Sequence, residues 1–514
     1  MAKTHLLNLI QKLSALADLS NKAGMPPIDE IAEWFEHQSE KGNRRDFIKQ
    51  SMGAGSILLA NNAFSPHVTN PPAHLKIAII GAGIAGLNAG YTLHKNNFTH
   101  NFSIYEASGR IGGRIYTDKL NGNNATTELG AEFIDCNHED MLCLANELGI
   151  EKIDTQKDTL VSDLFVIDGK KYHIKDAIKS FQNIRQKIAT DAKAQGKNYF
   201  DLDYTSLKEY LSSLETDAWF LKGLSLAYTG EYGLETEVQS SLNFIELIGE
   251  QEQGTFDIFG KSDERFKLKG GNHQICEKIA KKFPNKIHYN HALQHIRNKN
   301  KGFLLKFSNQ SEEVFADFVI MTFPFTILKN IEGINTLSGM SKEKLNCIQG
   351  LGYGTNAKCF LEFKERVWRK HGYNGAFYAD DLQNGWDSFL LQNQNQGKSI
   401  FTIFLGGENG AEVTSKSGES YLPKIEEAFS GATANYSGYT NQFNWSKYPF
   451  SKGSYQCLKT GQRITMLKHI DTPLGNLLFA GEHCSKEFGG FMNGGAETGR
   501  IAAERIIKKV LNRR

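Results

Sequence analysis

Leu75-Lys76-Ile77-Ala78-Ile79-Ile80-Gly81-Ala82-Gly83-Ile84-Ala85-Gly86 is the stretch of sequence that decides the fold. An apolar run of strand length is followed at once by a Gly-x-Gly-x-x-Gly turn, and helical spacing continues to about Lys95. The next predicted strand is Phe102–Glu106, and its last residue, Glu106, lies 20 residues beyond Gly86. This order of strand, glycine turn, helix, strand and acidic residue predicts a βαβ unit that binds a dinucleotide.

The residues of this unit have distinct expected roles. Gly81 permits the tight turn, Gly83 lets the backbone approach a pyrophosphate, and Gly86 lets the helix pack against the strand. Ala82 belongs to the same cofactor-binding turn, and the start of the helix offers free N–H groups to phosphates. Glu106 is expected to accept hydrogen bonds from the adenosine ribose.

A second glycine- and arginine-rich run follows directly, at Gly109-Arg110-Ile111-Gly112-Gly113-Arg114. Guanidinium groups donate paired hydrogen bonds that suit a pyrophosphate, so Arg110, Gly113 and Arg114 are candidate cofactor ligands. An NAD-dependent domain has no need of this second cradle. The run therefore favours FAD as the dinucleotide.

The segment from Ile79 to Ile134, which ends Glu128-Leu129-Gly130-Ala131-Glu132-Phe133-Ile134, resembles the FAD-binding region of the flavin amine oxidases. That family includes the monoamine, polyamine and L-amino-acid oxidases. Further matching segments extend the resemblance from about residue 75 to 507: Leu268–Asn272 with Leu293, Lys358 with Phe363, Lys364 and Trp368, Phe479–His483, and Gly489–Gly499.

The resemblance implies a role for each matching residue. Gly130 and Ala131 belong to the cofactor site, Leu293 meets adenine through its backbone, and Glu482 binds the ribityl chain. The glycine-rich turn before Met492 aims backbone N–H groups at the flavin pyrimidine, where reduced flavin is negatively charged.

The resemblance also names three residues beside the reacting atoms. Lys358 matches the family lysine that holds a water at flavin N5, where a cation favours electron transfer to O2. Tyr455 and Phe491 match the two aromatic rings that flank the amine, although the second ring is usually Tyr. Ser454 stands where some relatives have the Cys that binds flavin covalently, so we expect non-covalent FAD.

The sequence thus predicts an α/β protein with a discontinuous Rossmann-like FAD domain of the glutathione-reductase type, interleaved with an α+β substrate domain. The predicted FAD domain comprises residues 74–155, 262–325 and 450–514, and the substrate domain comprises 156–261 and 326–449.

Residues 1–73 are predicted as a helical arm with an export signal. Asn43-Arg44-Arg45-Asp46-Phe47-Ile48-Lys49, with the weakly apolar stretch after it, resembles a twin-arginine signal. This resemblance predicts a periplasmic or secreted protein. The alternative is a cytoplasmic protein in which residues 1–73 are an ordinary helical arm.

Composition excludes several other classes of protein. With 59 Lys and Arg against 57 Asp and Glu, the net charge of +2 gives no basic field for nucleic acid. Seven scattered Cys without CxxC spacing, and fifteen His without a HExxH-like pair, argue against a disulfide framework or a metal site. No apolar run approaches ~18 residues, so no transmembrane anchor is expected.

The favoured activity is oxidation of a primary amine: hydride passes from the amine Cα–H to flavin N5, the imine hydrolyses to an aldehyde and ammonia, and O2 is reduced to H2O2. An L-amino-acid oxidase is the first alternative. It would need an Arg for the substrate carboxylate, and the stretch 130–133 contains none, which leaves Arg185 and Arg265. A non-catalytic FAD-binding protein is the second alternative, and a desaturase with the same FAD fingerprint is less favoured.

Overall fold

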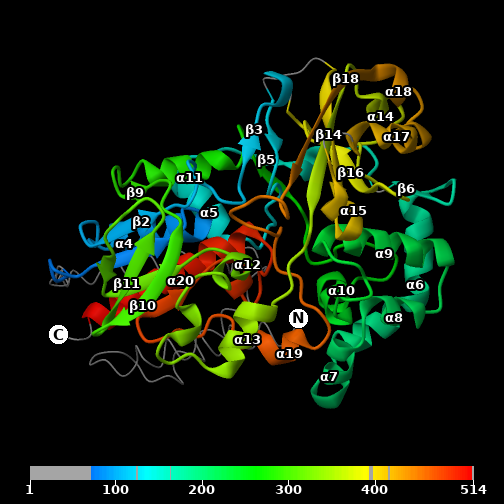
Figure 1. Ribbon diagram of the computed structural model, residues 1–514. Coiled ribbons are helices and arrows are strands. Elements are labelled where there is room, and N and C mark those ends of the chain that lie inside the picture. Colours follow the sequence, from blue (N-terminus) through cyan, green and yellow to red (C-terminus); the bar gives the residue numbers. More distant parts are fainter. Residues whose placement is uncertain (1–70, 123–124, 163, 393–396, 415–416, 512–514) are drawn as a thin grey trace, which may run out of the picture. The chain divides into compact units, whose positions relative to one another are not determined.

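The computed structural model describes residues 71–511 except 123–124, 163, 393–396 and 415–416 (Figure 1). The twin-arginine-like segment therefore lies outside the described residues. Everything below concerns the unit that begins at Asn70.

Five parallel strands form the first sheet, in the order β19-β13-β1-β2-β9. These strands come from widely separated parts of the chain, and Figure 1 labels two of them, β2 and β9. Their bounds are Ile77–Ile80 (β1), Phe102–Tyr105 (β2), Ile287–His288 (β9), Phe318–Met321 (β13) and Leu477–Phe479 (β19).

Both faces of this sheet are covered, which explains why its strands are continuous apolar runs. Ile77 and Ile79 point into a core with helices α4 (Ile84–Lys95) and α20 (Met492–Leu511). Ala78 and Ile80 point into the opposite core. The elements on that side are β10 (Leu293–Lys299), β11 (Gly302–Phe307) and β12 (Val314–Ala316), which form an antiparallel sheet, with α12 (Phe325–Leu328) and α13 (Lys342–Gly350).

A seven-stranded sheet forms the second part, in the order β18-β14-β17-β16-β15-β6-β7. Its second and third strands, β14 and β17, are antiparallel and fully buried apart from Phe404. Helix α9 (Ala218–Tyr232) packs on β16, β15 and β6. The strands are Leu164–Ile167 (β6), Lys170–Tyr172 (β7), Ala357–Phe363 (β14), Phe377–Ala379 (β15), Gln383–Asp387 (β16), Ser399–Leu405 (β17) and Tyr436–Asn444 (β18).

The remaining elements surround these sheets. Two short ladders pair β3 (Thr117–Asp118) with β4 (Thr127–Glu128) and β5 (Lys152–Asp154) with β8 (Phe266–Leu268). The other α-helices are Glu139–Glu147 (α5), Ile174–Asp191 (α6), Gly196–Tyr204 (α7), Leu207–Ser212 (α8), Ser241–Ile248 (α10), His273–Ala280 (α11), Val367–Lys370 (α14), Gly407–Glu412 (α15), Ser417–Ser420 (α16), Leu422–Ala428 (α17), Ala432–Asn435 (α18) and Gln462–Met466 (α19).

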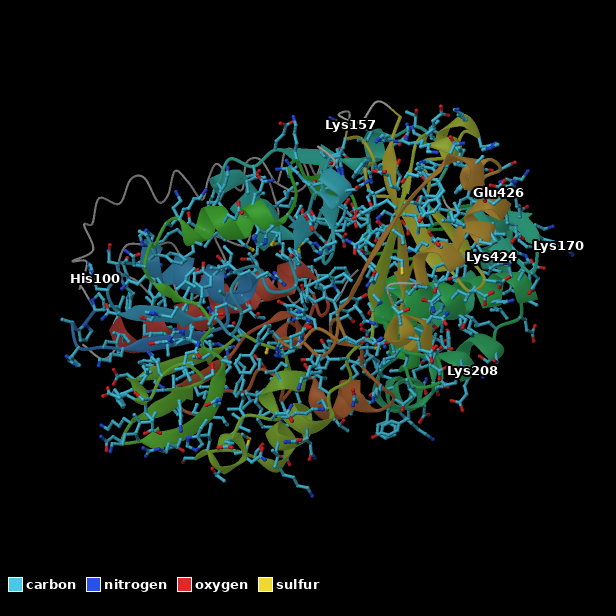
Figure 2. All side chains as sticks on the ribbon, turned by 45° about the horizontal axis from the view of Figure 1, so that its top comes forward. His100, Lys157, Lys170, Lys208, Lys424 and Glu426 are labelled. Atoms are coloured by element: carbon cyan, nitrogen blue, oxygen red, sulfur yellow. The ribbon has the colours of Figure 1, made fainter. Side chains whose placement is uncertain are left out.

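Charged side chains such as His100, Lys157, Lys170 and Lys208 are exposed at the periphery (Figure 2). Within the described residues, no helix has both the length and the apolar character needed to cross a membrane.

The α/β class predicted from the sequence is confirmed, and β2 ends one residue earlier than predicted, so that Glu106 follows the strand. Strands β9 and β10 follow each other closely along the chain but belong to different sheets. The break falls at Asn290, whose φ of +59° is incompatible with an extended strand. The predicted domain boundaries stay a prediction.

Candidate active site

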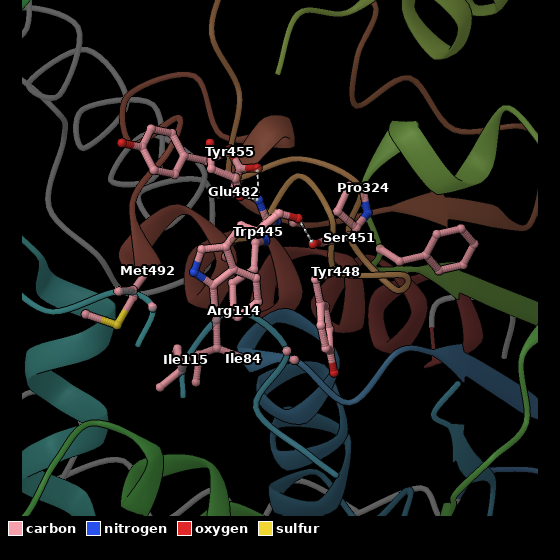
Figure 3. A pocket seen from close by; sticks show the side chains of 18 of the residues that line it. Ile84, Arg114, Ile115, Pro324, Trp445, Tyr448, Ser451, Tyr455, Glu482 and Met492 are labelled. Carbon is pink, nitrogen blue, oxygen red and sulfur yellow. Dashed lines mark hydrogen bonds and ion pairs between the residues drawn. The ribbon is translucent and has the colours of Figure 1, made fainter. Parts of the chain in front are cut away.

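One cavity of about 480 Å³ is lined by residues from both large sheets, and Figure 3 shows some of the side chains that line it. All but two of the site residues predicted from the sequence line it. Those lining it are Gly81, Gly83, Glu106, Arg110, Gly113, Arg114, Gly130, Ala131, Leu293, Lys358, Tyr455, Glu482, Phe491 and Met492. The exceptions, Ala82 and Gly86, lie behind the cavity wall.

The glycine turn after β1 leaves no room for side chains on its inner side. Gly81 has a φ of +111°, and a Cβ atom there would lie 2.5 Å from Thr322 Oγ1. A Cβ atom on Gly86 would lie 1.9 Å from the carbonyl oxygen of Gly81, so helix and turn are in direct contact. Gly83 is different: it starts helix α4, and its missing side chain leaves space in the cavity. The helix N-terminus thus faces the cavity, where it suits an anion.

Glu106 lies at the end of β2 and is 8% exposed. One carboxylate oxygen accepts from the Ala82 N–H at 2.8 Å, and the other accepts from the N–H and the hydroxyl of Ser108 at 2.8 and 2.7 Å. These bonds give Ala82 a role although it does not line the cavity, because its N–H orients Glu106. A carboxylate accepts about four hydrogen bonds, so Glu106 keeps capacity for a ribose hydroxyl.

The two arginines after β2 have different partners. Arg114 Nη1 donates to Glu482 Oε1 at 2.8 Å and to the Ser454 carbonyl at 2.6 Å (Figure 3). Arg110 donates to the carbonyls of Ile111 and Gly113, and its guanidinium carbon lies 4.1 Å from the centre of the Tyr116 ring. Both guanidinium groups are held at the cavity wall by the chain itself.

Glu482 also fixes the turn that leads into helix α20. Its Oε2 atom accepts from the Gly490 N–H at 2.9 Å. Gly490 has a φ of +89° and lies against the Tyr455 ring. Helix α20 starts at Met492, which lines the cavity, so the free N–H groups at the start of this helix lie at the cavity wall; their predicted role at the flavin pyrimidine stays a prediction. Further along, a Cβ atom on Gly499 would lie 2.0 Å from the Ala85 carbonyl oxygen, which shows how closely α20 crosses α4.

Lys358 comes from β14 and is 4% exposed. Its ammonium group donates to the carbonyls of Glu128 at 3.1 Å and Gly130 at 3.0 Å, and to Glu132 Oε2 at 2.8 Å. An ammonium group has three N–H donors, so these three acceptors engage all of them. In this arrangement Lys358 acts on its surroundings through its charge.

Tyr455 and Phe491 both line the cavity. The Tyr455 hydroxyl donates to the Glu231 carbonyl, and burial raises the pKa of this phenol well above its usual value, so it is neutral. The Phe491 ring lies 5.0 Å from His138, centre to centre. The two rings line the same cavity, and their role as a pair flanking the amine stays a prediction.

Two acidic residues in this cavity were missed by the sequence reasoning. Asp135 is 3% exposed, and its carboxylate accepts from the Glu264 N–H at 3.0 Å. Glu231, on α9, has no hydrogen bond or ion pair from its carboxyl group to any described residue. Burial raises the pKa of Glu231 to about 7, with a contribution from Asp135, and burial raises that of Asp135 to about 6. Neither residue belongs to a local motif, so only the fold brings them together.

The two arginines considered for a substrate carboxylate do not reach the cavity. Arg265 binds Asp154 in a two-point ion pair, with distances of 3.2 and 2.9 Å. Arg185 donates to the Gln251 carbonyl at 3.2 Å. Within the described residues, no cluster of side chains suits a metal ion.

The arrangement fits a flavin dinucleotide. Gly83 and the start of α4 offer space and N–H groups for phosphates, and Glu106 lines the same cavity. Arg114, Glu482, Lys358 and Met492, at the start of α20, line it as well. One cavity thus holds the features expected for both ends of FAD.

Residues 84–507 match the sequence profile of the family described as flavin containing amine oxidoreductase. This chain belongs to that family. Amine oxidase [flavin-containing] A of Sus scrofa is 23% identical over 458 residues, which are 84% of each chain. Amine oxidase [flavin-containing] B of Rattus norvegicus is 23% identical over 465 residues, covering 84% of this chain and 86% of its own.

Solved structures of this family share the fold. Cyclohexylamine oxidase from Brevibacterium oxydans superposes with a TM-score of 0.74 at 20% identity, covering 85% of this chain and 99% of its own. Putrescine oxidase bound to putrescine superposes with a TM-score of 0.73 at 18% identity, covering 84% and 99%. As a flavin containing amine oxidoreductase, the protein is an enzyme that uses FAD.

Proposed function

We propose that this enzyme oxidises a small primary amine with O2, yielding an aldehyde, ammonia and H2O2. The reaction consumes one amine, one O2 and one water, and it forms one aldehyde, one ammonia and one H2O2, so it is balanced. Bound FAD supplies the redox chemistry, because it accepts hydride from the amine Cα and passes the electrons to O2. The chain supplies binding, orientation and the local electrostatic field.

The residues that hold FAD do so through charge and backbone geometry. The start of α4 and Arg110 would bind the pyrophosphate, and Glu106 the ribose. The Arg114–Glu482 ion pair would fix the ribityl side, and the start of α20 would stabilise negative charge on the pyrimidine. Lys358 places a cation at the wall of the substrate end.

The acidic residues that line the cavity favour an amine over an amino acid as the substrate. Asp135, which is buried, and Glu231, which is partly exposed, line the cavity, and in their ionised form they attract a cation and repel a carboxylate. An amine arrives as an ammonium ion, which these groups stabilise before it loses its proton. The walls nearby are aromatic, with Tyr455, Phe404 and Trp386, and such rings favour a cation as well.

An L-amino-acid oxidase is the competing function, and it fits the cavity less well. Among the described residues that line the cavity, the guanidinium groups are those of Arg110 and Arg114, and both are held by the chain. A substrate carboxylate would therefore be buried without a free guanidinium and beside two acids. Such burial costs several kcal/mol.

A peroxide-coupled assay with matched substrate pairs tests the proposal. Each pair consists of an amine and its parent amino acid, such as phenylethylamine and phenylalanine, with putrescine as a diamine. We expect kcat/KM to favour the amine at least about tenfold, which corresponds to ~1.4 kcal/mol. The reverse order would establish the amino-acid oxidase, and absence of peroxide with every substrate would refute both.

A further inference from the structure

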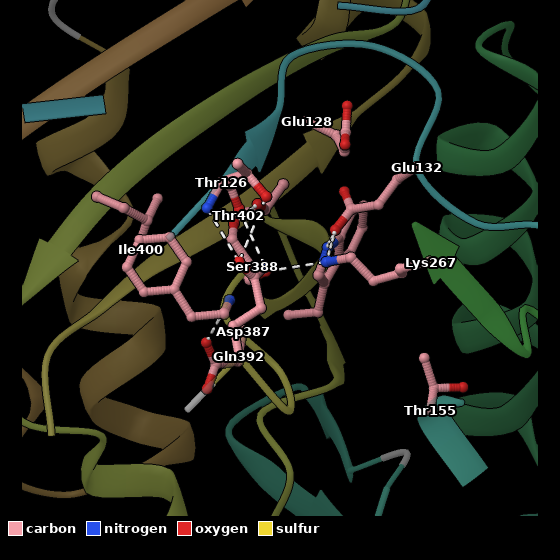
Figure 4. Close-up of polar contacts among 12 residues, drawn as sticks. Thr126, Glu128, Glu132, Thr155, Lys267, Asp387, Ser388, Gln392, Ile400 and Thr402 are labelled. Carbon is pink, nitrogen blue, oxygen red and sulfur yellow. Dashed lines mark hydrogen bonds and ion pairs between the residues drawn. The ribbon is translucent and has the colours of Figure 1, made fainter. Parts of the chain in front are cut away.

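A second buried lysine lies behind Lys358. Lys267, on β8, donates to Glu132 Oε1 at 2.7 Å, while Lys358 donates to Glu132 Oε2 at 2.8 Å. Figure 4 shows Lys267 between Glu132 and Ser388, whose carbonyl accepts a further hydrogen bond at 2.9 Å. The side chains of Lys267 and Glu132 are only 5% and 3% exposed. One carboxylate therefore bridges two buried ammonium groups.

The cluster carries an excess positive charge. Burial favours the neutral form of Glu132, but the two lysines outweigh this effect and hold its pKa at about 2. Glu132 is thus an anion between two cations. The neighbouring acid, Glu128, has a pKa raised to about 7 by burial, so at pH 6 it is mostly protonated. At that pH the group of Lys267, Glu132 and Lys358 has a net charge of +1.

This excess charge depends on Lys267, although Lys267 does not line the cavity. Without Lys267, Lys358 and Glu132 would form a neutral pair, whose field falls off faster than that of a net charge. Glu132 and Lys358 both line the cavity, so the field of the cluster acts there. Reduced flavin is electron-rich, and a positive field stabilises it relative to oxidised flavin.

We propose that Lys267 is a positioning residue that holds Glu132 against Lys358 and sets the reduction potential of bound FAD by keeping the cluster positively charged. This role of Lys267 does not depend on which substrate the enzyme oxidises, because it concerns only the chain and bound FAD. It assigns a role to a side chain that no sequence motif marks.

The experiment measures the midpoint potential of bound FAD at pH 6 by equilibration with a reference dye. Lys267→Gln removes the charge but keeps an N–H donor for Glu132, and Lys267→Met removes both. We expect each to shift the equilibrium roughly tenfold toward oxidised FAD, which for a two-electron couple is about 30 mV. Lys267→Arg keeps the charge and should stay near the wild-type potential.

A charge-rescue variant separates this electrostatic role from a structural one. Lys267→Met with Glu132→Gln leaves Lys358 as the single charge, so the net charge returns to +1 and the potential should recover. Lys269→Met is the matched control, because Lys269 is exposed and pairs with Glu151 outside the cavity. FAD affinity and the melting temperature report on folding separately.

The results have direct meanings. A wild-type potential in FAD-bound Lys267→Gln or Lys267→Met would overturn the proposal. A lowered potential that the double variant fails to restore would also overturn it, because the loss would then be structural. Failure of the enzyme to oxidise amines would refute the proposed function but leave the potential measurable, so the two ideas are tested apart.

Discussion

Replacing Lys358 with methionine should separate the two halves of the catalytic cycle. Methionine keeps most of the side-chain volume and removes the charge. Substrate oxidation depends mainly on distance and alignment, which the cavity walls supply, so anaerobic flavin bleaching should slow by no more than about tenfold, the factor expected from the lost positive charge. Reoxidation differs, because negative charge builds on O2 as the first electron arrives, and a fixed cation stabilises it.

The size of the effect follows from the charge cluster. Removing Lys358 lowers the net charge of the cluster from +1 to zero, because Glu132 and Lys267 remain paired at 2.7 Å. Loss of one such contact is worth ~2–4 kcal/mol in the transition state, which slows reoxidation roughly thirty- to a thousand-fold. The carbonyls of Glu128 and Gly130 also lose their donor, at ~1–3 kcal/mol each, so the melting temperature should fall.

Stopped-flow absorbance of the flavin resolves the two phases. Lys364→Met is the control, because Lys364 follows the same strand but is exposed and does not line the cavity. We expect Lys358→Met to bleach at most about tenfold more slowly than the wild type with amine under anaerobic conditions, and to regain colour in air roughly thirty- to a thousand-fold more slowly. Fast reoxidation with collapsed reduction would refute the reasoning, since Lys358 would then position the substrate.

Three further predictions concern substrate binding, the cofactor link and export. Glu231→Gln should lower kcat/KM for amines about 10- to 100-fold at pH 8. Because the pKa of Glu231 is about 7, this carboxyl group is protonated below pH 6, and the ratio of the wild-type kcat/KM to that of the variant should fall toward one there. A ratio that does not change with pH would contradict this. Ser454 is buried and donates to Asn356 Oδ1 at 2.6 Å, and serine cannot form a flavin thioether, so acid precipitation should release all FAD into the supernatant; yellow colour in the pellet would show a covalent link. Arg44→Lys with Arg45→Lys should trap active enzyme in the cytoplasm, and an unchanged distribution between cell fractions would favour the helical arm.

The cofactor half of the site was predictable from sequence because its chemistry is local. Gly81, Gly86 and Glu106 belong to one βαβ unit. Close packing leaves no space for a side chain at Gly81 or Gly86, and Gly81 also has a positive φ. The later motifs, at Lys358 and before Met492, were placed by resemblance to a family. The structure adds the reason they meet: strands from distant parts of the chain join one parallel sheet, and α20 crosses α4 through glycine contacts.

The sequence by itself determined the fold class, the use of FAD and the family, because each depends on residues at fixed spacing along the chain. It gave no sign of the acidic residues Asp135 and Glu231, nor of the link from Lys267 through Glu132 to Lys358. Only the tertiary structure decided these features, because they join segments more than 90 residues apart in the sequence. Burial and proximity, which set the pKa of a carboxyl group and the charge of a cluster, are properties of the folded chain.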